Sequence, residues 1–195
     1  LVVLAYFFFG SAVTHIGQAE KEAAGIAERR SGRRGPENVW GSALTAAVCA
    51  LLTWVVPVTV LPWLALGYVA SFSTKLSDTT ASEVGKAYGQ RTFLITTLQP
   101  VPRGTEGAVS LEGTLAGFLA GFVLALLGWG VGMISGWGIV FCTIAAFVAT
   151  NLESLIGATL QTQWDWLSNE IVNGINTFLG AAIAIGLAWG LQGLI

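Results

Sequence analysis

Long runs of apolar residues alternate with short polar intervals along the whole chain. A helix that crosses a bilayer needs about 20 predominantly apolar residues, and the apolar runs predict six spans. They cover residues 1–16, 40–56, 58–74, 111–133, 137–152 and 171–191. We therefore expect an all-α, polytopic transmembrane helical bundle that forms one domain over residues 1–195, with polar loops at 17–39, 75–110 and 153–170.

The first apolar run begins at Leu1 with no polar segment before it. It lacks the basic stretch and the small-residue cleavage site of a signal peptide, so we interpret it as the truncated end of a spanning helix. Pro57 and Pro62 predict a tight turn between the second and third spans. The glycine-rich stretch at 132–138 predicts another turn between the fourth and fifth spans.

Composition supports the membrane interpretation. Hydrophobic residues make up 54% of the chain and charged residues only 10%, whereas soluble domains carry about 25% charged residues. The net charge of −2 excludes the basic footprint of a nucleic-acid-binding protein. Cys49 and Cys142 stand singly in apolar runs, which argues against a disulfide framework or a zinc site.

The basic residues gather on one predicted side of the membrane. All nine fall within 17–39 or 75–110, and two predicted spans separate these intervals. Both intervals therefore return to the same side, which the positive-inside rule makes cytoplasmic. We expect the chemistry of the protein at that interface.

Small and amide residues recur at helical spacing. Glycines lie every four residues from Gly113 to Gly121, and small residues at 81, 85 and 89 repeat the interval. Such spacing lets helices approach closely in lipid. Asn169, Asn173 and Asn176 form a stripe at the start of the last span, and this stripe must face a partner or a wet cavity.

The polar stretch after the third span suggests a metal site. Asp78, or the serine before it, is expected to cap a short interfacial helix near 79–90 that also carries Glu83 and Lys86. Two carboxylates at a helix start suit Mg²⁺, which prefers one or two carboxylates together with waters and substrate phosphates. The alternative is an ordinary capped surface helix with lysines as counter-charges.

Two glycine-rich stretches suggest an anion site. At 103–107 and 110–114, glycines stand beside hydroxyl, acidic and basic residues. Backbone N–H groups and the N-terminus of the following helix can approach a phosphate there, although the spacing of a P-loop is missing. A flexible loop capped by Ser110 and Glu112 is the alternative.

Further polar elements complete the expected shell. Asn151 and Glu153 at the end of the fifth span suit a metal or phosphate shell, or simply the end of a span at the interface. The positive-inside rule explains the bases of the loop at 29–38 fully, but not residues 35–38 immediately before a span. No Ser/His/Asp or Cys/His arrangement has convincing spacing. Together the elements favour phosphoryl transfer to a lipid, which depends on positioning and charge neutralisation.

Several long motifs resemble the DUF92/TMEM19 family of integral membrane proteins. They read S-D-T-x-A-S-E-x-G-K-x-Y-G over 77–89, R-G-T-E-G-A-V-S-x-E-G-T-x-A-G over 103–117, N-x-E-S-x-x-G-A over 151–158 and N-E-x-x-N-x-x-N-T over 169–177. The segment 21–40 resembles the photosynthetic branch of this family, which includes a phytyl-phosphate kinase of plants and cyanobacteria. The family is also distantly similar to CTP-dependent phytol and dolichol kinases.

The resemblance implies a kinase that transfers a phosphate from a nucleotide, expected to be CTP, to phytyl monophosphate for tocopherol and phylloquinone synthesis. It implies catalytic roles for Asp78, Glu83, Lys86 and Arg103, and Mg²⁺ held by Asp78, Glu83, Asn151 and Glu153. The residues expected to bind nucleotide or phosphate are Ser77, Ser82, Gly104, Thr105, Glu106, Gly107, Ser110, Glu112, Gly113, Thr114, Asn169, Asn173, Asn176, Arg33, Arg34 and Asn38.

The resemblance also implies the surroundings of the protein. The glycine-faced spans would cradle the isoprenoid tail, and the partners would be the lipid bilayer, an isoprenoid monophosphate and a nucleotide, with a homo-oligomer left open. The site would lie on the cytoplasmic or stromal face of a bacterial or cyanobacterial membrane or a chloroplast envelope.

Other functions stay open at this point. A prenol kinase acting on the free alcohol and a cytidylyltransferase that forms a CDP-lipid use the same kind of site. A lipid transporter would instead place polar residues in paired, broken helices at the membrane midplane. A structural or assembly subunit would not need acids, bases and glycines gathered on one side.

Overall fold

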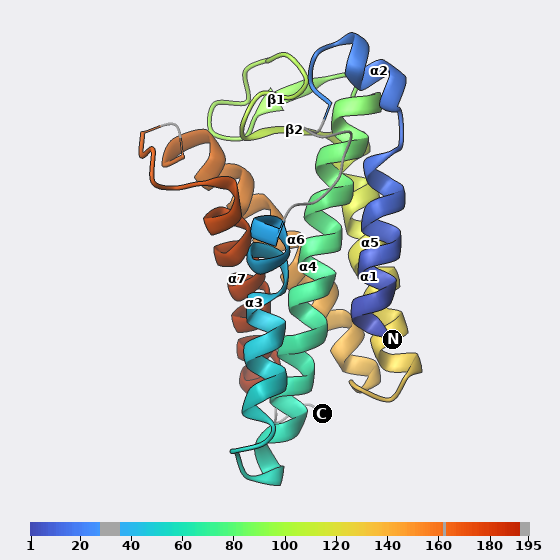
Figure 1. Cartoon of the computed structure of the whole chain (residues 1–195), viewed down its shortest axis with the longest axis vertical. Coiled ribbons are helices and arrows are strands. Elements are labelled where there is room, and N and C mark those ends of the chain that lie inside the picture. The colour runs from blue at the N-terminus through green and yellow to red at the C-terminus, as the bar shows by residue number, and fades with distance from the viewer. Residues whose placement is uncertain (28–35, 162, 192–195) are drawn as a thin grey trace.

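The computed structural model describes residues 1–27, 36–161 and 163–191, and within them it shows a helical bundle with one small hairpin (Figure 1). Seven α-helices and two strands occur in these residues. They are α1 (Val2–Thr14), α2 (Gln18–Ala23), α3 (Pro36–Leu52), α4 (Leu61–Tyr88), β1 (Thr92–Leu94), β2 (Ala108–Ser110), α5 (Leu111–Gly130), α6 (Gly136–Thr159) and α7 (Asn169–Gly190). A short 3₁₀ turn, η2 (Val58–Val60), precedes α4.

The mostly helical architecture confirms the predicted fold class, with two refinements. Six of the helices overlap the six apolar runs, and α2 is a short additional helix. The antiparallel β1–β2 hairpin, in which Thr92 pairs with Ser110, lies in an interval expected to be a loop. The predicted turns occur at 53–60, which includes Pro57, and at 131–135.

Helix α4 is the centre of the bundle and is surrounded by α1, α3, α5, α6 and α7. Val69 and Phe72 in its lower half, and Leu76 just past its midpoint, belong to the hydrophobic core. Phe72 packs against Tyr6 of α1 with ring centroids 5.1 Å apart. Its upper half buries polar residues instead. This helix is therefore apolar toward its neighbours at one end and polar toward them at the other.

The short interfacial helix expected near 79–90 is not a separate element. Helix α4 runs unbroken to Tyr88, so Ser77 and Asp78 lie in its interior and do not cap a new helix. The polar side chains of this stretch are buried among the neighbouring helices. Because they find their partners there and not in water, the helix continues without a break. Residues 75–88 of the expected polar loop thus belong to α4.

Three described helices, α5, α6 and α7, are long and apolar enough to cross a membrane. Helix α1 and residues 38–52 of α3 are apolar but shorter. Helix α4 has 28 residues, or ~42 Å at 1.5 Å per residue, but carries many polar side chains. The chain is thus an integral membrane protein by this criterion, and the full six-span arrangement stays a prediction.

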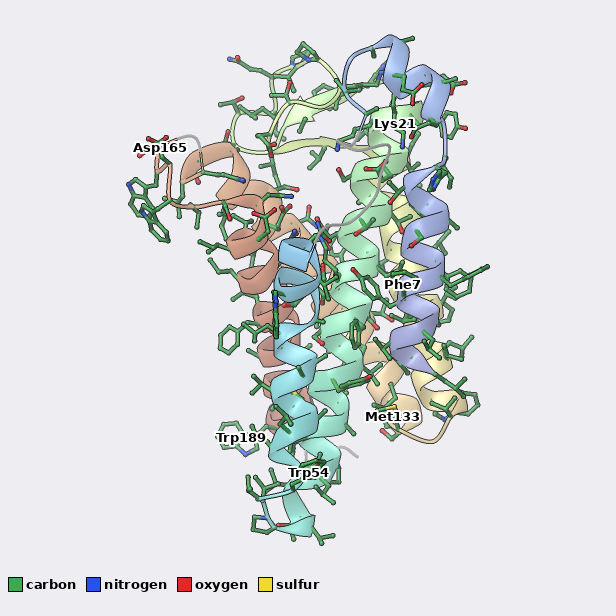
Figure 2. The ribbon with its side chains drawn as sticks, viewed as in Figure 1. Phe7, Lys21, Trp54, Met133, Asp165 and Trp189 are labelled. Atoms are coloured by element: carbon green, nitrogen blue, oxygen red, sulfur yellow. The ribbon has the colours of Figure 1, made fainter. Side chains whose placement is uncertain are left out.

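The two ends of the bundle differ in character. Lys21 and Asp165 lie at the end that carries α2 and the hairpin, called the polar end below, whereas Trp54, Met133 and Trp189 lie toward the opposite end (Figure 2). The connections at that opposite end, 53–60 and 131–135, contain no charged residue. This asymmetry agrees with charges gathered on one side of the membrane.

The glycines of α5 bring it against the polar half of α4. A Cβ on Gly113 would lie 2.5 Å from the Ala81 carbonyl oxygen, and a Cβ on Gly117 would lie 2.7 Å from the Ser77 carbonyl oxygen. The predicted close approach of helices at this glycine run is confirmed. Because α4 and, at Gly121, α6 pack against this face, it has no room for a lipid tail.

We expect Gly117→Ala to lower the free energy of unfolding by about 1–3 kcal/mol, because the added methyl meets α4 backbone that cannot move aside cheaply. Gly130→Ala is the matched control, since nothing lies within 4 Å of the position of its Cβ. Thermal unfolding in detergent micelles measures both variants. Equal unfolding temperatures would contradict the proposed packing.

Candidate functional site

A pocket of about 760 Å³ opens at the polar end of the bundle. Its wall comes from α4, α6 and α7, from Asn38 of α3, from residues 104–110 and from the start of α5. These elements converge beside the β1–β2 hairpin and α2 (Figure 1). We call this the polar pocket, and polar side chains buried in an apolar bundle mark it as the candidate site.

The pocket brings most of the sequence-predicted residues together. Segments separated by more than a hundred residues meet in one wall, as the six-span prediction requires. The predicted residues that line it are Asn38, Ser77, Asp78, Ser82, Glu83, Lys86, Gly104, Thr105, Glu106, Gly107, Ser110, Gly113, Thr114, Asn151, Glu153, Asn169 and Asn173.

A few predicted residues lie elsewhere. Arg103 is outside the pocket wall, where its Nη1 donates a hydrogen bond to the Ala87 carbonyl oxygen at 2.8 Å near the end of α4. Glu112 is also outside the wall, in the first turn of α5. Asn176 is fully buried below the pocket, and its amide has no hydrogen-bond partner among the described residues. Arg33 and Arg34 lie outside the described residues.

Lys75 is the most deeply placed cation of the polar pocket. Its Nζ donates to Asp78 Oδ2 at 2.5 Å and to Asn173 Oδ1 at 2.6 Å. Lys75 is 5% exposed and Asn173 2% exposed. A buried ammonium needs such partners because an unpaired one is very costly. The three side chains therefore join α4 to α7 at the floor of the pocket.

A second buried ion pair lies nearer the rim. Lys21 of α2 is fully buried and pairs with Glu83, and its Nζ also donates to the Thr14 carbonyl oxygen at 2.7 Å. Lys86 lies 3.7 Å from the other carboxylate oxygen of Glu83. Glu83 thus anchors α2 to α4, and both lysines neutralise its charge.

The carboxyl groups of Asp78 and Glu153 both line the pocket and lie close enough to interact electrostatically. Two carboxyl groups this close need either a shared proton or a cation between them. In the described part of the chain, no three His, Cys, Asp or Glu side chains are grouped to hold a metal. The pair fits Mg²⁺, which takes one or two carboxylates and completes its shell with waters and phosphates.

Other expected metal ligands have engaged side chains. Asn151 Nδ2 donates to the Phe147 carbonyl oxygen at 2.7 Å. Glu83 is engaged with lysines, as described above. Asp78 is likewise engaged, with Lys75, and Asn151 donates through its nitrogen, which leaves its Oδ1 oxygen for an ion. All four residues therefore stay predicted Mg²⁺ ligands.

Residues 104–107 line the pocket and pack closely against Ile26 on one side and α6 on the other. A Cβ on Gly104, where φ is +82°, would lie 2.8 Å from the Ile26 side chain. A Cβ on Gly107, where φ is +74°, would lie 2.4 Å from the Ala158 side chain and 2.6 Å from the Ser154 carbonyl oxygen. These two positions accept only glycine without a shift, so the backbone of this segment packs closely against Ile26 and α6.

Sequence reasoning gave Lys75 only a counter-charge role and left Lys21 and Thr150 out of the site. Thr150 lines the pocket and lies 3.3 Å from the Ser77 hydroxyl. The available signal for Lys75 was its place three residues before Asp78, on the same helical face. Lys21 offered no comparable signal, because its partner is 62 residues away.

Comparison with known proteins identifies relatives over nearly the whole chain. The family model described as "Integral membrane protein DUF92" matches residues 1–181. An uncharacterized membrane protein of Synechocystis sp. is 80% identical over 187 residues, which are 96% of this chain and 72% of that protein. No solved structure matches the chain.

Two further relatives are more distant. The chloroplastic protein VTE6 of Arabidopsis thaliana is 49% identical over 189 residues, which are 95% of this chain but only 57% of that protein. An uncharacterized membrane protein of Methanocaldococcus jannaschii is 33% identical over 186 residues, 95% of this chain and 74% of its own length. The polar pocket therefore belongs to a region that these longer proteins share.

We expect Lys21→Met to lower the free energy of unfolding by about 3–5 kcal/mol, because it leaves the Glu83 carboxylate buried without its main partner. The double variant Lys21→Met/Glu83→Gln removes that charge and should recover part of the loss. Unfolding followed by tryptophan fluorescence in detergent measures both, with Glu22→Gln on exposed α2 surface as control. A double variant no more stable than Lys21→Met would rule out the ion pair as the cause.

Proposed function

This chain belongs to the DUF92 family of integral membrane proteins, and we propose that it is a membrane-embedded kinase for isoprenoid phosphates. In this proposal it transfers a phosphate from CTP to phytyl monophosphate and forms phytyl diphosphate. The observation that carries the proposal is the polar pocket itself, in which buried lysines and carboxyl groups lie beside a glycine-rich segment at one end of an apolar bundle.

The pocket supplies the groups that phosphoryl transfer requires. This reaction depends on positioning the reactants and on neutralising phosphate charge, and needs no nucleophile from the protein. Lys75 and Lys86 bring positive charge to the wall. The N-terminus of α5 lies in the same wall, and the Gly113 N–H there donates a hydrogen bond to the Ser110 hydroxyl oxygen at 3.1 Å. Backbone N–H groups at the start of a helix favour the binding of anions.

We assign separate roles to the acidic residues. Asp78 and Glu153 would hold Mg²⁺, which when bound neutralises charge on the nucleotide phosphates. Glu83 keeps α2 and α4 together through its pair with Lys21. The segment 104–107 would pass over the nucleotide phosphates, since its residues line the pocket and include two glycines.

The proposed reaction forms one bond and breaks one. An oxygen of the phytyl phosphate attacks the γ-phosphorus of CTP, the bond from that phosphorus to the β-phosphate oxygen breaks, and CDP leaves with the electron pair. Lys75 and Lys86 stabilise the charge on the transferred group. Attack on the α-phosphorus would instead make a CDP-lipid and release diphosphate, which is the cytidylyltransferase alternative.

The choice of a phytyl acceptor rests on the sequence motifs shared with the photosynthetic branch of the family. A Synechocystis relative at 80% identity and a chloroplastic Arabidopsis relative at 49% support a photosynthetic setting. The exposed aromatic side chains of the bundle, such as Phe7, Phe118 and Phe178, suit contact with lipid, from which a long-tailed acceptor would arrive.

Position-specific labels in CTP test the reaction. Purified protein is incubated with phytyl phosphate, or in parallel with free phytol, together with Mg²⁺ and CTP labelled at the γ- or the α-phosphate. Lipid products are separated and identified by mass. We expect γ-label in phytyl diphosphate and no α-label in lipid. Transfer of α-label to the lipid would establish the cytidylyltransferase alternative, and γ-labelled product formed from free phytol would establish a prenol kinase. The absence of any labelled lipid product would refute all three reactions.

We expect Asp78→Asn to lower kcat on the order of 100-fold or more, as for loss of a group that stabilises transition-state charge. Asparagine keeps an oxygen acceptor for Lys75, so the fold should persist. Asp165→Asn is the matched control, because Asp165 is exposed and lies outside the pocket. Steady-state kinetics of folded, monodisperse protein measures both variants, and retained activity in Asp78→Asn would remove Asp78 from the site.

A further inference from the structure

A second pocket lies between α3 and α7 on the flank of the bundle, with a volume of about 610 Å³. We call it the α3–α7 groove. Its wall is almost wholly apolar and includes Leu44 and Val48 of α3 and Phe178, Ile185 and Trp189 of α7. Gly67 of α4 lies behind the groove residues Cys49 and Ile185. A Cβ added at Gly67 would lie 3.2 Å from Cys49 and 3.1 Å from Ile185, so α4 packs against the groove residues at a position that has no side chain.

The seam between α3 and α7 changes from polar to apolar along its length. At the polar end, Asn38 and Asn173 line the polar pocket. One or two turns farther, the hydroxyl groups of Thr45 and Thr177 are 3.0 Å apart. Thr45 itself lines the groove, and Gly174, which follows Asn173, lines its beginning. Neighbouring residues of α7 thus face the two pockets.

The groove has the length and exposure of a site for an extended chain. Gly174 and Trp189 are 15 residues apart on α7, or ~22 Å at 1.5 Å per residue, a large part of a hydrocarbon core of about 30 Å. Phe178 and Trp189 are 62% and 72% exposed, so the groove is open along its side. A hydrocarbon chain can therefore enter it laterally from the bilayer.

We propose that the α3–α7 groove binds the isoprenoid tail of the lipid phosphate whose headgroup enters the polar pocket. This proposal rests on the proposed kinase function and names the tail site within it. The graded seam matches an amphiphile with an anionic head and a long apolar tail. It replaces the glycine-faced spans expected from sequence, because α4 already occupies the glycine face of α5.

Two glycines of the groove make the test sharp. Nothing lies within 4 Å of a Cβ on Gly186, and the nearest atom to a Cβ on Gly174 is the Gly41 carbonyl oxygen at 4.0 Å. A side chain can therefore begin at either position without a Cβ clash, and leucine is chosen to occupy part of the groove. Gly190 is the matched control on the same helix, with open space around it and no part in the groove.

Gly186→Leu fills the end of the groove remote from the polar pocket. We expect it to raise KM for phytyl phosphate by about tenfold while leaving KM for the shorter geranyl phosphate unchanged. Gly174→Leu fills the near end and should raise KM for both lipids. Gly190→Leu should change neither, and KM for CTP should stay constant in all three. Wild-type values for both lipids in Gly186→Leu and Gly174→Leu would overturn the proposal.

A binding measurement separates this proposal from the kinase function. Phytyl phosphate with a photoreactive group near the end of its tail is crosslinked to wild-type protein, and the labelled peptide is identified by mass spectrometry. We expect labels on α3 or α7 near Ile185, reduced by Gly186→Leu and by excess unlabelled phytyl phosphate. Labelling on α5 would overturn the groove proposal even if kinase activity is present. Labelling that is reduced by excess bulk phospholipid but not by excess phytyl phosphate would overturn it as well. Labels on α3 or α7 without phosphate transfer would support it while refuting the kinase.

Discussion

The structure depends on the pairing of one buried ammonium group. Lys75 lies in the middle of α4, the most enclosed helix of the bundle, and its charge is matched by Asp78 on the same helix and by the Asn173 amide oxygen on α7. A charge at this depth is tolerated only where it is paired inside the protein. The pairing therefore requires α7 beside α4 and turns the polar face of α4 inward.

The other contacts at the polar end depend on the polar face of α4, which is turned toward the neighbouring helices. Helix α5 approaches α4 through glycines because the polar side chains and backbone of α4 leave no space for larger residues. Helix α2 is held on the last turns of α4 by the Lys21–Glu83 pair. The pocket is what remains between these elements, so the interactions that stabilise the polar end also form the walls of the site.

Much of this arrangement could be predicted from sequence, because hydrophobic runs, glycine spacing and the amide stripe each reflect one local physical rule. The six apolar runs overlap six helices, and most of the site residues meet in one pocket. The continuation of α4 through 75–88 could not be predicted, since a polar run looks the same whether its partners are water or other helices. Partners distant in sequence, as for Lys21 and Arg103, leave no local pattern.

The segment 104–107, which lines the pocket, is held largely by shape, together with the neighbouring hydrogen bond from Arg103 to the Ala87 carbonyl oxygen. Gly104 fits against Ile26 and Gly107 fits against Ala158 and Ser154 through van der Waals contact, which dissolved ions do not screen, and the pairs beneath it are buried, where screening is weak. The architecture of the site is thus insulated from ionic strength. Salt therefore changes chiefly the rate and affinity with which a charged reactant reaches the protein from solution. The arrangement of the site residues stays the same.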